Sequence, residues 1–181
     1  LIFDSNAIDS FDEIFYENKS DEFFEYFLEF VINSLNSDSE YIETIINRYC
    51  NPTLINIFIE HSCPLKCKGC RAIQTMYFLA DPNLIDQSLT PDIVEGLISM
   101  LFTQFPIDSV DISFFIFQTF HTVFDKLESI QSELVFNVAQ TIAETIESED
   151  YENLINCADN EKISQEAINM KQYVEKLLAV S

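Results

Sequence analysis

Three cysteines in the first half of the chain have a spacing that suits metal chemistry. Cys63, Cys67 and Cys70 follow the pattern C-x3-C-x2-C, and His61 lies two residues before the first of them. Cysteine thiolates are good ligands for iron–sulfur clusters. With the histidine they could also supply four zinc ligands, although the sequence has no second C-x2-C pair and no paired histidines.

The same spacing also fits helix packing without any metal. Pro64 can occupy the first turn of a helix, and residues 63, 67 and 70 would then share one helical face. Small cysteines, with Gly69 beside them, would let a second helix approach closely, since a cysteine thiol often behaves as a small buried apolar group. Packing, zinc binding and iron–sulfur binding all stay open, and packing is the interpretation that we carry forward.

The spacing also resembles that of radical S-adenosylmethionine enzymes, in which three cysteines hold a [4Fe–4S] cluster. An apolar run, LINIFIE (54–60), precedes the cysteines as it does in that family. The resemblance implies a partial (β/α) barrel, which needs alternating strands and helices over a longer chain. That family also has a glycine-rich cofactor strand downstream, but the segment VDISFFIF (110–117) has no glycine. In addition, Gly69 occupies the position where an aromatic residue usually precedes the last cysteine. We therefore expect no catalytic residues, no metal ligands and no cofactor.

The stretch 70–102 predicts a helix, a turn and a second helix. The first helix is expected to end at Asp81-Pro82-Asn83, because proline lacks an N–H and disfavours the helical conformation of the residue before it. Thr90 can cap the second helix and Pro91 can occupy its first position. Apolar residues recur at helical spacing in both helices, namely Ile73, Met76, Tyr77 and Ala80, then Val94, Leu97, Ile98 and Leu101.

This pattern returns 44 residues later. IQTMYFLAD (73–81) aligns with FQTFHTVFD (117–125), and Val94, Ile98 and Phe102 fall on Val138, Ile142 and Ile146. A period of about 40–47 residues is typical of HEAT and armadillo arrays. AIQTMYFLAD…IVEGLISML resembles the second and third helices of an armadillo repeat, over residues 58–148 or so. The resemblance implies an all-α fold, a right-handed superhelical stack of helix pairs or triplets with roughly three to four repeats.

The flanking segments also predict helices. Strong helical patterns cover 21–35, 110–126, 132–147 and 164–180, the last capped by Asp159 or Ser164, and shorter ones cover 8–17 and 40–50. Residues 54–61 fit either a strand or a buried helix, and their helical neighbours favour a helix. No linker divides the chain, so we expect a single helical repeat domain over 1–181. It begins at Leu1 rather than methionine, which suggests a fragment of a longer chain.

The composition excludes several classes of partner. The chain has 31 acidic residues and only nine basic ones, which gives a net charge of −22. Such a charge repels nucleic acids and anionic membranes, and no apolar run has the ~20 residues of a membrane span. The odd number of cysteines, without a signal-peptide pattern, indicates reduced thiols and a cytoplasmic or nuclear location. The charge itself indicates either attraction of a basic partner or simple solubility.

In armadillo-like proteins the third helix of each repeat lines a groove that binds extended peptides. The resemblance assigns this role to the helices at 91–104 and 132–147. Their polar sides, opposite the apolar stripes, carry the predicted contact residues Asp92, Glu95, Ser99, Thr103, Glu133, Asn137, Gln140 and Glu144. We therefore predict a non-catalytic scaffold or adaptor domain that binds a protein or peptide, with a basic segment as the expected partner. The alternative functions are an iron–sulfur or zinc protein that uses Cys63, Cys67 and Cys70, and a helical bundle without a groove. For the polar sides of the two helices, the alternative is an ordinary solvated surface.

Overall fold

The computed structural model describes residues 20–37, 51–102, 109–157 and 160–179, together with Glu43 and Ile46. Within these segments all regular structure is helical and no strand occurs, which confirms the predicted all-α class. The predicted helix at 8–17, and most of that at 40–50, lie outside the described residues. The helices are α2 (Asp21–Ser37), α4 (Asn51–Glu60), α5 (Cys63–Leu79), α6 (Pro82–Ser88), α7 (Pro91–Leu101), α8 (Ser109–Ser129), α9 (Leu134–Ile146), α10 (Glu149–Ile155) and α11 (Glu161–Leu178).

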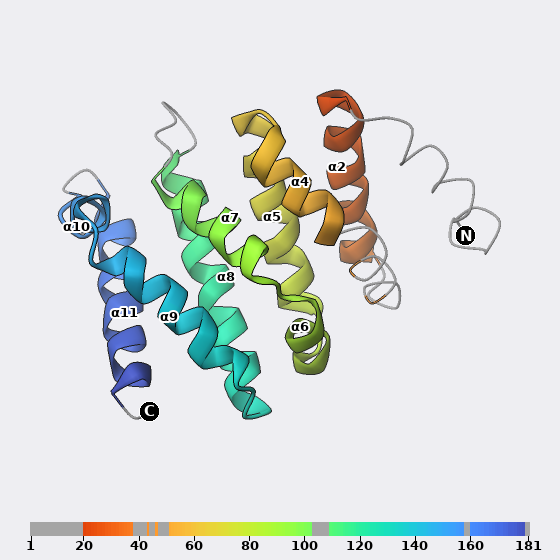
Figure 1. Cartoon of the computed structure of the whole chain (residues 1–181). Helices are drawn as coiled ribbons and strands as arrows, with labels where there is room; N and C mark the ends of the chain where they lie inside the picture. The colour runs from red at the N-terminus through yellow and green to blue at the C-terminus, as the bar shows by residue number, and fades with distance from the viewer. Residues whose placement is uncertain are drawn as a thin grey trace.

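The helices form two layers (Figure 1). In one layer α2, α5, α8 and α11 lie side by side in this order, and in the other α4, α7 and α9 do the same. The short helices α6 and α10 connect one layer to the other. The helices that the 44-residue offset relates, α5 with α8 and α7 with α9, are neighbours within a layer.

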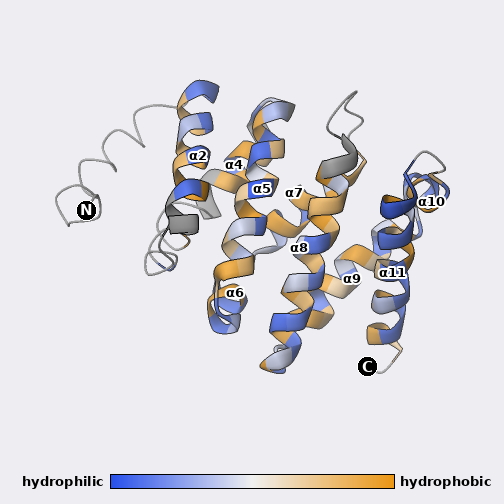
Figure 2. Ribbon diagram, turned by 180° about the vertical axis from the view of Figure 1, so that it is seen from behind, coloured by the Kyte–Doolittle hydropathy of each residue, from blue (hydrophilic) through white to orange (hydrophobic). Residues whose placement is uncertain are grey.

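The hydrophobic core fills the space between the layers. Figure 2 shows hydrophobic residues on the sides of the helices that face other helices. The predicted apolar stripe of α5 is fully buried, and so is that of α7 except for the half-buried Ile98. Both predicted stripes are therefore confirmed. They are buried because each of these helices packs against neighbours in its own layer and against the opposite layer.

The ambiguous segment 54–61 is helical, as predicted, for all but its last residue. Leu54, Ile57 and Phe58 are buried at the i, i+3, i+4 spacing of a helix. Phe58 packs on Gly96 of α7 so closely that a Cβ atom there would lie 2.5 Å from the ring. A Cβ atom on Gly69 would stand at 3.6 Å from its nearest neighbours, which is ordinary contact. Gly69 does face α4, as the packing interpretation expects, but only at Gly96 is the approach too close for a Cβ atom.

The connection after α5 is a helix rather than the predicted turn. Pro82 ends α5 but occupies the first position of α6, where its missing N–H costs nothing. The Asp81 carboxylate caps this helix by accepting a hydrogen bond from the Leu84 N–H at 3.0 Å. A proline that ends one helix can begin the next, and this explains the difference.

Two predicted caps are also wrong. Thr90 precedes α7 with the expected extended backbone, but its side chain makes no capping hydrogen bond. At α11 the cap is Asn160, whose side chain accepts a hydrogen bond from the Ile163 N–H at 3.2 Å. Ser164 lies inside that helix and donates to the Ile155 carbonyl, while Asp159 is outside the described residues.

Lys126 joins two helices of one layer. Its ammonium group donates hydrogen bonds to the carbonyls of Tyr77, Phe78 and Ala80, at 2.9, 2.7 and 2.5 Å. Carbonyls at a helix C-terminus lack partners within the helix and favour a cation. Burial lowers the pKa of Lys126, which the nearby Asp81 carboxylate opposes. Lys126 of α8 thus caps the end of α5, 44 residues after the proline that ends it.

Candidate interaction surface

Seven of the eight predicted contact residues are exposed on, or directly before, two helices of the α4–α7–α9 layer. Asp92, Glu95 and Ser99 of α7 are exposed, as are Glu133, just before α9, and three residues within α9, Asn137, Gln140 and Glu144. Because α7 packs against α9, these residues form one surface, which we call the acidic face. Thr103, the eighth predicted contact residue, lies outside the described residues.

The carboxylates of the acidic face are not neutralised by the described part of the chain. Asp92, Glu95, Glu133 and Glu144 have no ion-pair partner among the described residues. Some of the described cations have contacts elsewhere in the fold, as Lys126 does at the end of α5. Lys68, for example, pairs with Glu25 and Glu29 of α2, and these bonds raise its pKa. The acidic face therefore retains a negative potential that a cationic group from outside can satisfy.

Ser99 differs from the other residues of the acidic face. Its hydroxyl donates a hydrogen bond to the Gly96 carbonyl of the same helix at 2.7 Å. A hydroxyl has one proton to donate, so a partner can use Ser99 only as an acceptor while this bond is kept.

A small cleft of about 30 Å³, which no sequence pattern predicted, lies between α7 and α9. It is lined by Leu89, Thr90, Pro91, Val94, Leu134, Asn137, Val138 and Thr141. Asn137 belongs both to this cleft and to the acidic face. The Thr90 hydroxyl oxygen is buried, and no hydrogen-bond partner for it exists in the part of the chain that the structure describes.

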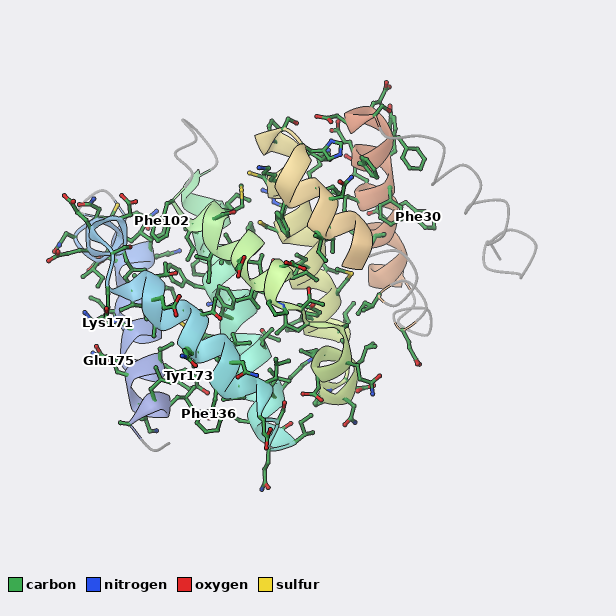
Figure 3. The ribbon with its side chains drawn as sticks, in the orientation of Figure 1. Phe30, Phe102, Phe136, Lys171, Tyr173 and Glu175 are labelled. Atoms are coloured by element: carbon green, nitrogen blue, oxygen red, sulfur yellow. The ribbon has the colours of Figure 1, made fainter. Side chains whose placement is uncertain are left out.

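A larger cleft of about 450 Å³ lies between α9 and α11 at the last helices of the two layers. Its lining includes Ile146, Val174 and Leu178, with Lys171 and Glu175 on α11 (Figure 3). Phe136 projects from α9 and is 42 % exposed. Charges of both signs border this cleft, in contrast to the uniformly negative acidic face.

The cysteine segment forms the start of α5. Cys67 is half-buried and Cys70 buried, while the side chain of Cys63 lies outside the described residues. Among the described residues no three histidine, cysteine or acidic side chains are grouped closely enough to hold a metal ion. His61 contacts α2 instead, with its Nδ1 2.6 Å from the Asp21 carboxylate. The zinc and iron–sulfur interpretations therefore gain no geometric support from the described side chains.

Asp21 fastens the start of α5 to the start of α2. Its carboxylate accepts hydrogen bonds from the Ser62 hydroxyl at 2.7 Å and from His61. These bonds hold the pKa of Asp21 below its usual range, because they favour the charged form. Phe24 packs against the His61 ring at 4.9 Å between centroids. His61 thus has a structural role here.

The second histidine also has structural contacts. His121 Nε2 of α8 is 3.2 Å from the Glu166 carboxylate of α11, and the Gln118 amide donates to the same carboxylate at 3.4 Å. These contacts tie neighbouring helices of one layer together. The Tyr173 ring of α11 also packs edge-on against the His121 ring, with 6.4 Å between centroids.

No family model matches this chain. Comparisons with curated proteins and with solved structures likewise give no significant match. The resemblance to armadillo and HEAT repeats thus stays a prediction from the sequence pattern. None of the helices in the described segments is both long enough and apolar enough to cross a bilayer.

Proposed function

We propose that this chain is an armadillo/HEAT-like scaffold or adaptor domain without catalytic activity, and that it binds a basic segment of a partner protein on the acidic face. The helix arrangement supports the repeat interpretation. Helices separated by 44 residues are layer neighbours, and each layer extends by adding one helix at a time. A stack of this kind presents an extended surface built from successive helices.

The observation that carries the proposal is the set of unneutralised carboxylates on two adjacent helices. Asp92 and Glu95 of α7 and Glu144 of α9 are exposed on the same layer, and none of the three has an ion-pair partner among the described residues. A net charge of −22 attracts cations over a distance that shrinks to ~8 Å at 0.15 M salt. At contact, carboxylates hold arginine by charge-assisted hydrogen bonds. Asn137 and Gln140 add amides that can bind the partner's backbone.

The test compares two charge reversals of equal size. Glu95→Lys combined with Glu144→Lys changes the acidic face, whereas Glu152→Lys combined with Glu175→Lys changes exposed positions on α10 and α11. Fluorescence anisotropy with a labelled arginine-rich nonapeptide measures binding at 50 and 150 mM salt. We expect at least a tenfold loss of affinity for the first pair, little change for the second, and unchanged melting temperatures for both.

Each other outcome has a definite meaning. Equal weakening by the two pairs would show that the net charge alone attracts the peptide, and the acidic face would lose its role. Binding that survives the first pair and ignores salt would make the acidic surface a solubility feature. Loss of binding in the second pair alone would move the site to the cleft between α9 and α11. Affinity capture followed by mass spectrometry, with the Glu95/Glu144 variant as the control, would then identify the partner.

A further inference from the structure

The larger cleft, between α9 and α11, lies where both layers of described helices end. In the α4–α7–α9 layer, α7 packs on α5 and α8 of the opposite layer, and α9 packs on α8 and α11. The next position in this layer is beside α9 and over α11, and no helix of the described segments occupies it (Figure 1).

On α9 the cleft is formed by the side that faces away from α7. Asn137 and Thr141 line the small cleft toward α7, whereas Ala143 and Glu147 line the larger one. Residues 141 and 143 are about 200° apart around a helix with 3.6 residues per turn, so they lie on opposite sides of α9.

On α11 the cleft is formed by the side that faces away from α8. The Tyr173 ring packs against the Phe124 ring of α8, with 5.1 Å between centroids. Lys171 and Glu175 are each two residues from Tyr173, on the opposite side of α11, and line the cleft (Figure 3). Both helices thus turn toward the cleft a side that is not packed against their layer neighbour.

Most of the cleft lining is apolar. Ile146 and Val174 are its most deeply buried residues, and the half-buried Ala143 and Leu178 lie one turn from them on the same helices. Phe136, 42 % exposed, extends this apolar strip by two turns of α9. A cavity of about 150 Å³ holds one benzene-sized group. The cleft of about 450 Å³ can therefore take about three apolar side chains.

Geometry and charge together indicate the occupant. Apolar side chains at helical spacing in a groove are the usual contact of an amphipathic helix. A second copy of this chain is disfavoured, because two molecules of charge −22 repel each other. At the border Lys171 and Glu175 carry opposite charges, so Glu147 leaves a net negative charge. Glu147 has no ion-pair partner among the described residues, and a partner residue beside it should therefore be basic.

We propose that the α9–α11 cleft is a second docking site, which takes an amphipathic helix of a partner protein. The bound helix continues the α4–α7–α9 layer, with apolar residues in the cleft and a lysine or arginine beside Glu147. This site is separate from the acidic face, because none of the acidic-face residues lines the cleft.

The test uses a labelled peptide of about 18 residues, or five helical turns, with leucines on one side and lysines beside them. A scrambled peptide of the same composition, whose leucines share no side, controls for charge. We expect the ordered peptide to bind at least about tenfold more tightly in fluorescence anisotropy. Ala143→Trp, which fills the cleft, should weaken the ordered peptide about tenfold. Gln172→Trp, at an exposed position of α11 outside the cleft, should leave its affinity unchanged.

A second pair of variants decides the question if circular dichroism shows that the tryptophan disturbs α9. Glu147→Lys and Glu152→Lys change the net charge equally, but only Glu147 borders the cleft. Glu147→Lys should weaken the ordered peptide about fivefold more than Glu152→Lys does. Equal binding of the two peptides, or equal effects of the two charge reversals, would overturn the proposal. So would sedimentation of the unmodified chain as a dimer that Ala143→Trp dissociates, because the occupant would then be a second copy.

Discussion

The two glycines of the chain provide a matched test of the helix packing. Both lie inside helices, where alanine is favoured over glycine by about 1 kcal/mol. At Gly69 an added Cβ atom meets ordinary contacts at 3.6 Å, so Gly69→Ala should raise the free energy of unfolding by about that amount. At Gly96 the same atom would lie 2.5 and 2.7 Å from Cδ2 and Cγ of Phe58. Cβ of Phe58, which the backbone fixes, would also lie at only 3.1 Å, so turning the ring cannot fully relieve the clash and α4 must shift from α7.

Overpacking of this kind typically costs about 1–3 kcal/mol. The free energy of unfolding of the Gly96→Ala variant should therefore be about 2 kcal/mol lower than that of the Gly69→Ala variant. Urea denaturation followed by circular dichroism measures both. The combination with Phe58→Ala isolates the cause, because without the ring Gly96→Ala should become stabilising. Equal effects of the two alanine substitutions, or an unchanged cost of Gly96→Ala in the Phe58→Ala background, would refute the close approach of α4 and α7.

Three further contacts can be tested by substitution. Lys126→Met should lower the free energy of unfolding by about 2 kcal/mol, because the carbonyls at the end of α5 lose a charged donor. Lys176→Met, an exposed position with the same charge change, should stay within about 0.5 kcal/mol in the same denaturation assay. Tyr151→Phe removes the hydrogen bond to the Ala167 carbonyl and should cost about 1 kcal/mol by the same measurement. The pKa of Asp21 is lowered in the fold, so its carboxylate contributes stability above about pH 4 that is lost on further acidification. The melting temperature of the Asp21→Asn variant should therefore change less between pH 5 and 3 than that of the unmodified protein.

The helices and their buried faces could be predicted because they depend on local spacing. Ile73, Met76 and Tyr77 recur at the period of a helix, and nothing in the tertiary structure changes which side they occupy. The exposed positions Glu95 and Glu144 follow from the same periodicity, since they lie opposite the apolar stripes. Their role in binding stays a prediction.

The missed features depend on contacts between segments that are distant in sequence. Gly96 marks a close approach of two helices because Phe58 of α4 packs directly on it, and no local sequence pattern shows this contact. Lys126 reads as an ordinary surface cation, yet it caps a helix 46–49 residues earlier in the chain. The cleft beside Thr90 arises from the way α7 lies against α9. A proline can end one helix or begin the next, and the sequence pattern at Pro82 predicts only the first of these roles.

The two-layer arrangement also bears on how the molecule opens and closes. Each helix makes most of its contacts with adjacent helices, as α10 does with α11 and α2 with α5. Most of the packing energy is therefore shared between adjacent helices. In such a structure the last helices can detach together while the first remain folded. Hydrogen exchange should then show α10 and α11 opening as one unit at a lower free energy than α5, which has packed neighbours on both sides within its layer. The molecule would then open in steps that begin at its C-terminal helices.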